Sequence, residues 1–230
     1  MDARRPFRFR DFFGGSLMQK QDALARIAQG VAKFQSEVYP AQREMFERLK
    51  RGQDPLALFL TCADSRVNPN LVTQTDPGEI FIERNPGNMV PPYVEFVGGV
   101  TAGVEYAMLV LKVPVIVVCG HTDCGVMKAL LHPQQVEGMP GVQHWMSHGF
   151  AARNRMLRES GETSEEEQLR AITEYNVLAQ IEHLKTHPSV RVRLLKGEIE
   201  IRGWVYDIGD GSIREANPAS GQFELLGNRR

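Results

Sequence analysis

A continuous apolar run near the middle of the chain, "VPVIVVCG" at 113–120, restricts the possible folds more than any other feature. It is rich in β-branched residues and does not alternate polar with apolar positions, which is typical of a parallel strand buried on both faces. Shorter apolar runs at 55–62 and 78–85 predict two further strands. Because segments of helical spacing separate these runs, we expect an α/β fold, with a central, mostly parallel β-sheet flanked by helices.

The remaining segments complete this fold. The alternating segment 198–216 predicts a strand or a hairpin that turns at Gly209-Asp210-Gly211. Apolar residues at helical spacing predict four helices around the sheet, at 97–112, 123–131, 142–159 and 165–186. The chain shows no internal repeat and no low-complexity linker.

The N-terminal part of the chain differs in pattern from the rest. Residues 1–18 are rich in arginine without an apolar stretch, so we expect a flexible arm rather than a secretory signal. Residues 19–50 predict two helices with a break near Tyr39-Pro40. The apolar side chains of these helices lead us to expect that they pack on a partner subunit. We therefore predict one domain over 19–230, of which 19–50 forms the helical arm.

Composition excludes several classes of function. The chain has 27 basic and 28 acidic residues and a net charge of -1, so nothing draws it to nucleic acid or to a membrane surface. No apolar run approaches the roughly 20 residues that cross a bilayer. Its 3 cysteines, an odd number, argue against a disulfide framework and for a reducing compartment. The cytoplasm is the expected location.

Three residues at the expected strand ends have the chemistry of a metal site. Cys62 ends the first strand, while His121 and Cys124 follow the third. If these two strands are neighbours, the three side chains meet at the carboxyl edge of the sheet, where ligands gather in such folds. Two thiolates and one imidazole suit Zn²⁺, and three protein ligands with a free fourth position are typical of a catalytic zinc.

Other interpretations of these residue types stay open. The cysteines could be small buried apolar residues, and Cys119, which precedes His121, is expected to point into the sheet. A redox pair of Cys119 and Cys124 is disfavoured because the spacing is not C-x-x-C. His144 and His148 share one helix face. An exposed pair or a subunit contact explains them better than a second metal site.

Asp64 and Arg66 stand two and four residues after Cys62. Asp64 could bind the fourth position of the metal and close the site. Alternatively, Arg66 could hold it back in a charge-assisted pair, so that Asp64 accepts a hydrogen bond from a zinc-bound hydroxide and orients it. A helix cap and a surface ion pair would be the purely structural roles. Since two thiolates neutralise the formal charge of the ion, we expect activity to need mildly alkaline pH.

The segments "CADSR" (62–66) and "GHTDCG" (120–125) together resemble the double signature of β-class carbonic anhydrases. The resemblance extends from about Val31 to Ile213. It implies a lyase that uses one zinc ion per chain to hydrate carbon dioxide reversibly to bicarbonate and a proton. It also implies that Cys62, His121 and Cys124 bind the zinc and that Asp64 and Arg66 form a catalytic dyad that orients the hydroxide.

Two further segments, "RNPGNMVPPY" (84–93) and "GVEYAMLVLKV" (103–113), are similar to the plant-like type I branch and to bacterial enzymes associated with cyanate operons. In that branch Gln53 matches a pocket glutamine that donates a hydrogen bond to bicarbonate. Phe81 and Tyr106 match an aromatic wall that a neighbouring subunit lends to the pocket, although core packing is their plainer role. The resemblance thus implies a homodimer or a larger homo-oligomer, with a tetramer and an octamer left open.

A second branch of the family has a closed form gated by bicarbonate. It carries tryptophan and glycine where this chain has Phe59 and Thr61, which argues against gating here. Arg84 and Tyr206, which the gated form also uses, are present. One departure from the plant-like branch is Pro86, which replaces a small aliphatic residue next to the substrate and puts the shape of the pocket in question.

Two rival functions remain open at this point. The first is a zinc-stabilised binding or regulatory protein in which Asp64 stays on the metal; the missing gating residues speak against it. The second is a hydrolase of carbon disulfide or carbonyl sulfide on the same fold. That activity needs a dry, narrow access tunnel, and no insertion or tail in the sequence obviously builds one.

Overall fold

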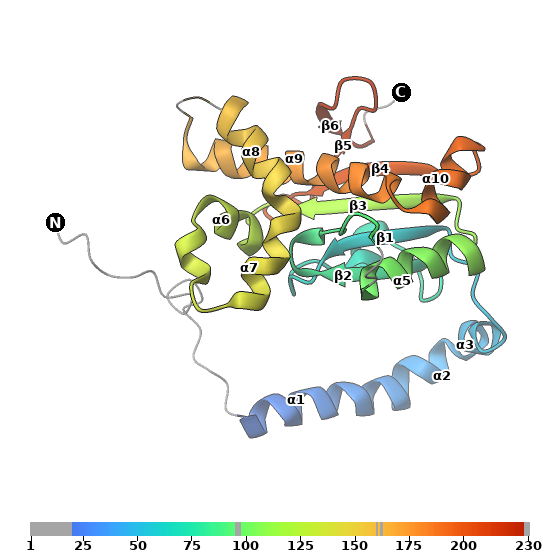
Figure 1. Cartoon of the computed structure of the whole chain (residues 1–230). Coiled ribbons are helices and arrows are strands. Elements are labelled where there is room, and N and C mark those ends of the chain that lie inside the picture. Colours follow the sequence, from blue (N-terminus) through green and yellow to red (C-terminus); the bar gives the residue numbers. More distant parts are fainter. Residues whose placement is uncertain (1–19, 95–97, 160, 162, 228–230) are drawn as a thin grey trace. The chain divides into compact units, whose positions relative to one another are not determined.

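The computed structural model describes residues 20–94, 98–159, 161 and 163–227 of the chain. The chain divides into two compact units, Met1–Gln53 and Asp54–Arg230. Figure 1 shows the elements of both units. The predicted flexible arm, 1–18, lies outside the described residues, and the single domain over 19–230 stays a prediction.

A mixed six-stranded sheet forms the centre of the second unit, in the order β2-β1-β3-β4-β5-β6. The first four strands in this order are parallel, and the last two pair antiparallel at one edge. The predicted strands and the predicted hairpin are confirmed, whereas the short edge strand β6 was not predicted. The strands are β1 Ala57–Cys62, β2 Ile80–Asn85, β3 Val115–His121, β4 Glu200–Tyr206, β5 Ile213–Ala216 and β6 Phe223–Leu225.

Helices surround this sheet, as predicted (Figure 1). The expected helix at 97–112 is α5 followed by a π-helical turn at Tyr106–Val110, and the expected helix at 142–159 divides into α7 and α8. The short helices α4 and α10 were not predicted. The helices are α4 Pro69–Thr73, α5 Gly99–Glu105, α6 Gly125–Leu131, α7 Pro140–Met146, α8 Phe150–Glu159, α9 Glu165–Lys185 and α10 Pro188–Leu195.

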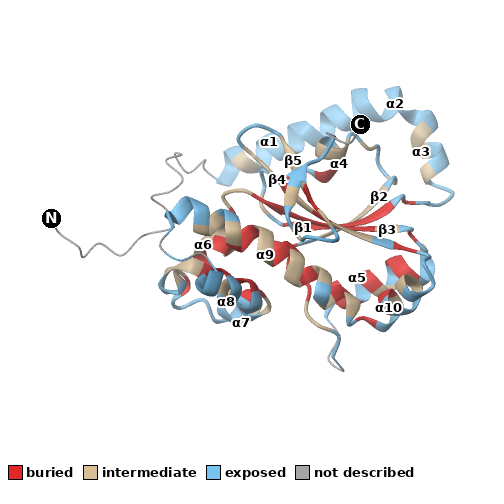
Figure 2. Cartoon of the chain, turned by 90° about the horizontal axis from the view of Figure 1, so that it is seen from above, coloured by how far each residue is buried: buried red, intermediate tan, exposed pale blue. Residues whose placement is uncertain are grey.

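The inner strands are buried on both faces, which explains their lack of alternation. Leu58 and Leu60 of β1 belong to the main core, together with buried side chains of α5, α9 and α10. Phe59, between them, faces the opposite side of the sheet and clusters with Val117 and Cys119 of β3. Figure 2 shows the buried residues concentrated in these strands and on the inner faces of α5, α9 and α10.

The order of the strands creates a switch point beside β1. From β1 the chain continues to β2 on one side and then crosses over to β3 on the other. β1 pairs with β3 in parallel, with Ala57 opposite Val115 and Thr61 opposite Cys119. The predicted neighbourhood of the first and third strands is therefore confirmed. Polar side chains at the carboxyl ends of these two strands must come together.

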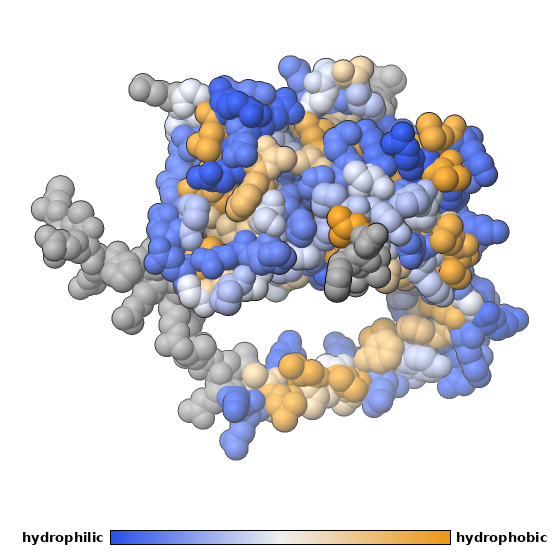
Figure 3. All heavy atoms as spheres, in the orientation of Figure 1, coloured by the Kyte–Doolittle hydropathy of each residue, from blue (hydrophilic) through white to orange (hydrophobic). Residues whose placement is uncertain are grey.

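The first unit consists of helices whose described residues are all at least partly exposed. It comprises α1 Lys20–Lys33, a π-helical turn at Phe34–Val38, α2 Tyr39–Ala41 and α3 Arg43–Leu49. The helix continues through Pro40 and breaks at Gln42, because the wider π turn, closed by the Tyr39 N–H on the Phe34 carbonyl, precedes the proline. Figure 3 shows apolar side chains gathered along these helices.

No helix within the described ranges is long and apolar enough to cross a membrane.

Candidate metal centre

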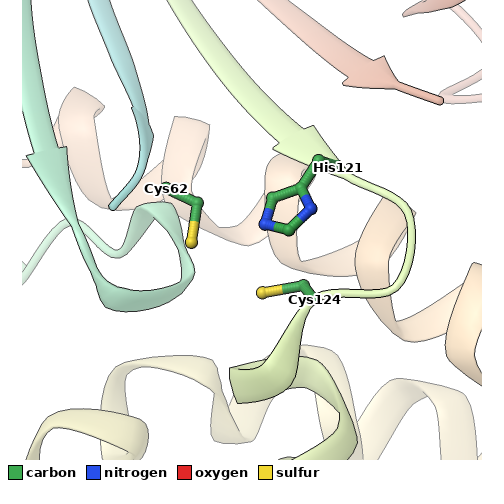
Figure 4. Close-up of side chains that lie close together, drawn as sticks. All are labelled: Cys62, His121 and Cys124. Carbon is green, nitrogen blue, oxygen red and sulfur yellow. The ribbon is translucent and has the colours of Figure 1, made fainter. Parts of the chain in front are cut away.

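The three predicted ligands lie at the switch point of the sheet. Cys62 is the last residue of β1, His121 is the last residue of β3, and Cys124 directly precedes α6. Their sulfur and ring nitrogen atoms lie within 4.8 Å of one another, and all three residues are buried. Figure 4 shows the two thiols and the imidazole ring facing a common space. Among the described residues, no other group of three such side chains meets this spacing.

The ring of His121 is prepared to bind a metal through Nε2. Its Nδ1 lies 2.8 Å from the Thr122 carbonyl oxygen, which can only accept, so Nδ1 carries the proton. Nε2 is then the acceptor of a neutral imidazole, and it is buried without a hydrogen-bond partner in the described part of the chain. An unpartnered buried nitrogen is costly unless something binds it. A metal ion between the two sulfurs would satisfy it.

The sulfur of Cys62 has a backbone donor. The Gly87 N–H lies 3.3 Å from Sγ, in a short 3₁₀ turn at Pro86–Asn88. Gly87 has φ 75°, and a Cβ there would come within 2.9 Å of Val126 Cγ1, so only glycine fits. The sequence analysis missed this donor, for which the only signal was the Pro-Gly pair that ends the second strand.

Two buried amides of α9 hold this turn in place. Asn176 Nδ2 donates to the Gly87 carbonyl at 3.0 Å, and Gln180 Nε2 donates to Asn176 Oδ1 at 2.9 Å. Gln180 Oε1 also accepts from the Val90 N–H at 2.7 Å. Hydrogen bonds to the groups around a metal ligand help to orient that ligand. Through Asn176, α9 thus holds Gly87, whose N–H donates to the Cys62 sulfur.

A hydrogen bond joins the thiols of Cys62 and Cys124. A hydrogen bond from Cys124 lowers the pKa of Cys62 to about 4, against the opposing effect of burial. The same bond and burial raise the pKa of Cys124 well above its ordinary value. One thiolate beside one thiol is the state that a divalent cation converts to two thiolates, with release of a proton. By contrast, burial raises the pKa of Cys119 to about 12, in line with its predicted place inside the sheet.

Asp64 and Arg66 form a two-pronged ion pair beside these ligands. Arg66 Nε lies 3.0 Å from Asp64 Oδ1, and Arg66 Nη2 lies 2.8 Å from Asp64 Oδ2. The backbone N–H of Arg66 also donates to Oδ1, at 2.9 Å. These hydrogen bonds lower the pKa of Asp64 to about 2, so the carboxylate is ionised at every physiological pH. Asp64 Oδ2 lies 3.9 Å from His121 Nε2.

The pocket residues predicted from the resemblance lie at different depths. Phe81 of β2 is half-buried and Tyr106 is exposed, with ring centroids 5.9 Å apart. Gln53 is exposed and belongs to the first unit. The backbone carbonyl of Pro86 accepts a hydrogen bond from the Trp145 indole N–H at 2.8 Å. The rings of Phe81 and Tyr106 thus contact each other, and their role as a pocket wall lent by a neighbouring subunit stays a prediction.

The residues relevant to gating are occupied by structural contacts. Phe59 is buried and meets Trp204 edge-on, with ring centroids 5.9 Å apart. The Thr61 hydroxyl donates to the Cys119 carbonyl at 2.9 Å. Arg84 donates to the carbonyl oxygens of Cys62 and Asp64, at 3.1 and 2.7 Å. Arg84 thereby fixes the backbone between the metal ligand and the aspartate.

The donor set fits a zinc ion. Two sulfurs and one imidazole nitrogen are the ligand types that zinc prefers, and two bonds of about 2.0–2.3 Å to one ion span about 4 Å. Asp64 is outside the group of three, so the described side chains offer three candidate ligands rather than four. This number is typical of zinc sites that leave one position for a reactant.

Comparison with known proteins agrees with this geometry. The family described as carbonic anhydrase matches residues 57–213. A carbonic anhydrase of Pseudomonas aeruginosa is 46% identical over 200 residues, which cover 87% of this chain and 90% of that relative. The solved structure of the β-carbonic anhydrase CcaA matches with a TM-score of 0.86 at 36% identity, covering 89% of this chain and 100% of that chain. One of two tetrameric β-carbonic anhydrases from Sordaria macrospora matches with a TM-score of 0.70 at 30% identity. This match covers 84% of this chain and 93% of that chain.

The chain therefore belongs to the carbonic anhydrase family, and its fold is that of the β class. The resemblance that the two signature segments indicated is confirmed. The protein is accordingly an enzyme of the carbonic anhydrase type, and its group of Cys62, His121 and Cys124 could hold a metal ion.

Replacing one ligand should abolish metal binding, and the chain offers a matched control. We expect Cys124→Ala to lose zinc, because two protein ligands cannot hold the ion tightly. Cys119→Ala makes the same change at a buried cysteine of the same segment and should retain about one zinc per chain. Metal analysis of both purified variants measures this. Zinc retained by Cys124→Ala, or lost from Cys119→Ala, would show that the ligands are wrongly assigned.

Proposed function

We propose that this enzyme hydrates carbon dioxide reversibly to bicarbonate and a proton at a zinc ion, with Asp64 and Arg66 as the dyad that orients the attacking water. The observation that carries the proposal is the position of the Asp64 carboxylate. Arg66 binds both of its oxygens, and Oδ2 lies 3.9 Å from the unpartnered nitrogen of His121. Asp64 is thus next to the three ligands without being one of them.

Cys62, His121 and Cys124 would hold one zinc ion per chain. When bound, zinc supplies a Lewis acid that makes water a strong nucleophile near neutral pH. The protein keeps the ligands in place through the Gly87 N–H on Cys62 and the Thr122 carbonyl on His121. These contacts fix which atoms face the ion.

The free lone pair of Asp64 gives the dyad its direction. Each carboxylate oxygen can accept about two hydrogen bonds. Oδ1 already accepts two from Arg66, through its backbone N–H and through Nε, whereas Oδ2 accepts one, from Nη2. The unused position is therefore on Oδ2, the oxygen that faces His121. An ionised carboxylate only accepts hydrogen bonds, so Asp64 selects a reactant that donates an O–H to it. The lone pair of that reactant's oxygen then points toward the substrate.

We extend the proposal to the substrate pocket and to the branch of the family. Phe81 and Tyr106 of a neighbouring subunit form an apolar wall for carbon dioxide, and Gln53 donates a hydrogen bond to bicarbonate. The engagement of Arg84 with the backbone of Cys62 and Asp64 supports the open, plant-like type I branch. The cytoplasm stays the proposed location, since the three cysteines are free and buried.

Removing the charge of Asp64 tests the dyad. Asp64→Asn should keep zinc but lose about 100-fold in the rate of hydration. An amide has one acceptor oxygen and an NH₂ donor, so it cannot accept hydrogen bonds from both Arg66 and the attacking water as a carboxylate does. Stopped-flow hydration from about pH 6.5 to about pH 9, with zinc measured on the same samples, gives the result. In the wild type we expect activity to rise smoothly toward alkaline pH.

Two results would contradict this proposal. Full activity of Asp64→Asn with zinc retained would remove the dyad from the mechanism. A wild type that contains zinc, is inactive near neutral pH and switches on steeply at alkaline pH would mean that Asp64 closes the site.

We further propose a homodimer or larger homo-oligomer in which the N-terminal helices lie across a second copy of this chain. Leu24, Ile27, Val31 and Val38 repeat at helical spacing, and all four side chains are exposed in the single chain. A helix with such an apolar stripe needs a partner to cover it. Phe34, which continues the stripe, packs edge-on against Tyr39 and Phe46.

Charge placed on this stripe should weaken the assembly. Ile27 is 66% exposed in the single chain, and burying it against a partner would contribute about 1.5–3 kcal/mol per copy. Ile27→Glu should therefore raise the dissociation constant more than tenfold, measured by analytical ultracentrifugation. Gln29→Glu adds the same charge on the same helix, away from the stripe, and should leave the assembly unchanged. An unaltered assembly of Ile27→Glu would contradict the proposed interface.

A further inference from the structure

Asp123, which lies between the ligands His121 and Cys124, makes a second ion pair with the arginine of the dyad. Asp123 Oδ2 lies 2.8 Å from Arg66 Nη1, and the Asp123 carbonyl accepts from Arg66 Nη2 at 3.1 Å. The other carboxylate oxygen of Asp123 is paired with Lys128 of α6. Charges thus alternate from Asp64 through Arg66 and Asp123 to Lys128.

These contacts determine how firmly Arg66 is held. A guanidinium has five N–H donors in one plane. Asp64 receives two of them, from Nε and Nη2, and Asp123 receives two more, from Nη1 and Nη2. The Arg66 side chain is 36% exposed, so without Asp123 water would compete for its outer edge. Asp123 therefore fixes the edge of the guanidinium that carries Nη1 and Nη2.

Asp123 has two roles that substitutions can separate: its backbone forms the turn between the two candidate ligands, and its side chain binds Arg66. Its φ is 60°, in the left-handed region that glycine and asparagine adopt easily and aspartate tolerates. A glycine or an asparagine would serve the turn between the two ligands equally well. Any residue here keeps the backbone carbonyl that accepts from Arg66 Nη2, but only a residue with a side-chain acceptor can also bind Arg66 Nη1.

We propose that Asp123 is a positioning residue: it holds the Arg66 fork in the plane that keeps Asp64 beside the metal ligands. This inference rests on the proposed role of the dyad. Asp123 lies between two cations, Arg66 and Lys128, and is paired with both. Its effect on the reaction passes through Arg66 and not through contact with substrate.

The test compares Asp123→Gly with Asp123→Asn, both of which suit the left-handed turn. We expect Asp123→Gly to keep its fold and about one zinc per chain while kcat/KM for hydration falls about tenfold. Asp123→Asn retains an acceptor for Arg66 and should stay within about threefold of the wild type. In the background Asp64→Asn, adding Asp123→Gly should cause no further loss, because the two residues act through one arginine.

A second readout does not depend on activity. The Arg66 Nε–H, observed by NMR, should exchange with water about tenfold faster in Asp123→Gly than in the wild type or in Asp123→Asn. Wild-type kcat/KM and exchange in Asp123→Gly would overturn the proposal. So would loss of zinc from Asp123→Gly, equal losses in both variants, or full additivity with Asp64→Asn. Full activity of Asp64→Asn alone would instead remove the dyad, so the two failures are distinguishable.

Discussion

Parallel pairing of β1 with β3 is the constraint on which the site depends. It places Cys62 at the end of one strand opposite the segment that carries His121 and Cys124. Both strands are packed on both faces, with Leu58 and Leu60 in one cluster and Phe59 in another, so a shift of register would exchange the side chains of the two faces and break both packings. The approach of Cys62 to His121 and Cys124, which lie some way along the sequence from it, is thus set by the packing of Leu58, Leu60 and their neighbours in the core.

The hydrogen bonds that hold Cys62 and its neighbours lie at the carboxyl end of the sheet. The Gly87 N–H donates a hydrogen bond to the Cys62 sulfur, and Asn176 donates to the Gly87 carbonyl and so holds this turn. Arg84 binds the backbone of the segment that leads from Cys62 to Asp64. The candidate ligands Cys62 and His121 are therefore held through backbone groups, and the charged side chains remain available for the proposed dyad.

The sequence was sufficient for the parts of the structure with a local signal. The strands showed as apolar runs, and the pairing of Asp64 with Arg66 was one of the alternatives left open, the one that the resemblance implied. The contact of Arg66 with Asp123 joins residues 57 positions apart, and no spacing rule reveals it. Gly87 and Asn176 were missed for the same reason. β6, α4 and α10 are too short for periodicity to show, and their formation depends on tertiary packing.

The alternating charges bear on what would keep Asp64 off the metal in the proposed open site. A carboxylate this close to a cation would bind it unless a competing cation held it more favourably. Arg66 competes through two parallel hydrogen bonds whose geometry matches a carboxylate, an arrangement stronger than a single neutral bond. That competition is effective only while the guanidinium cannot rotate, and its rotation is opposed from the opposite edge by Asp123. Lys128 in turn offsets the negative charge that Asp123 adds near the two thiolates. In the proposed open form, the position of Asp64 then depends on four charged side chains, Asp64, Arg66, Asp123 and Lys128, of which only the first two form the proposed dyad.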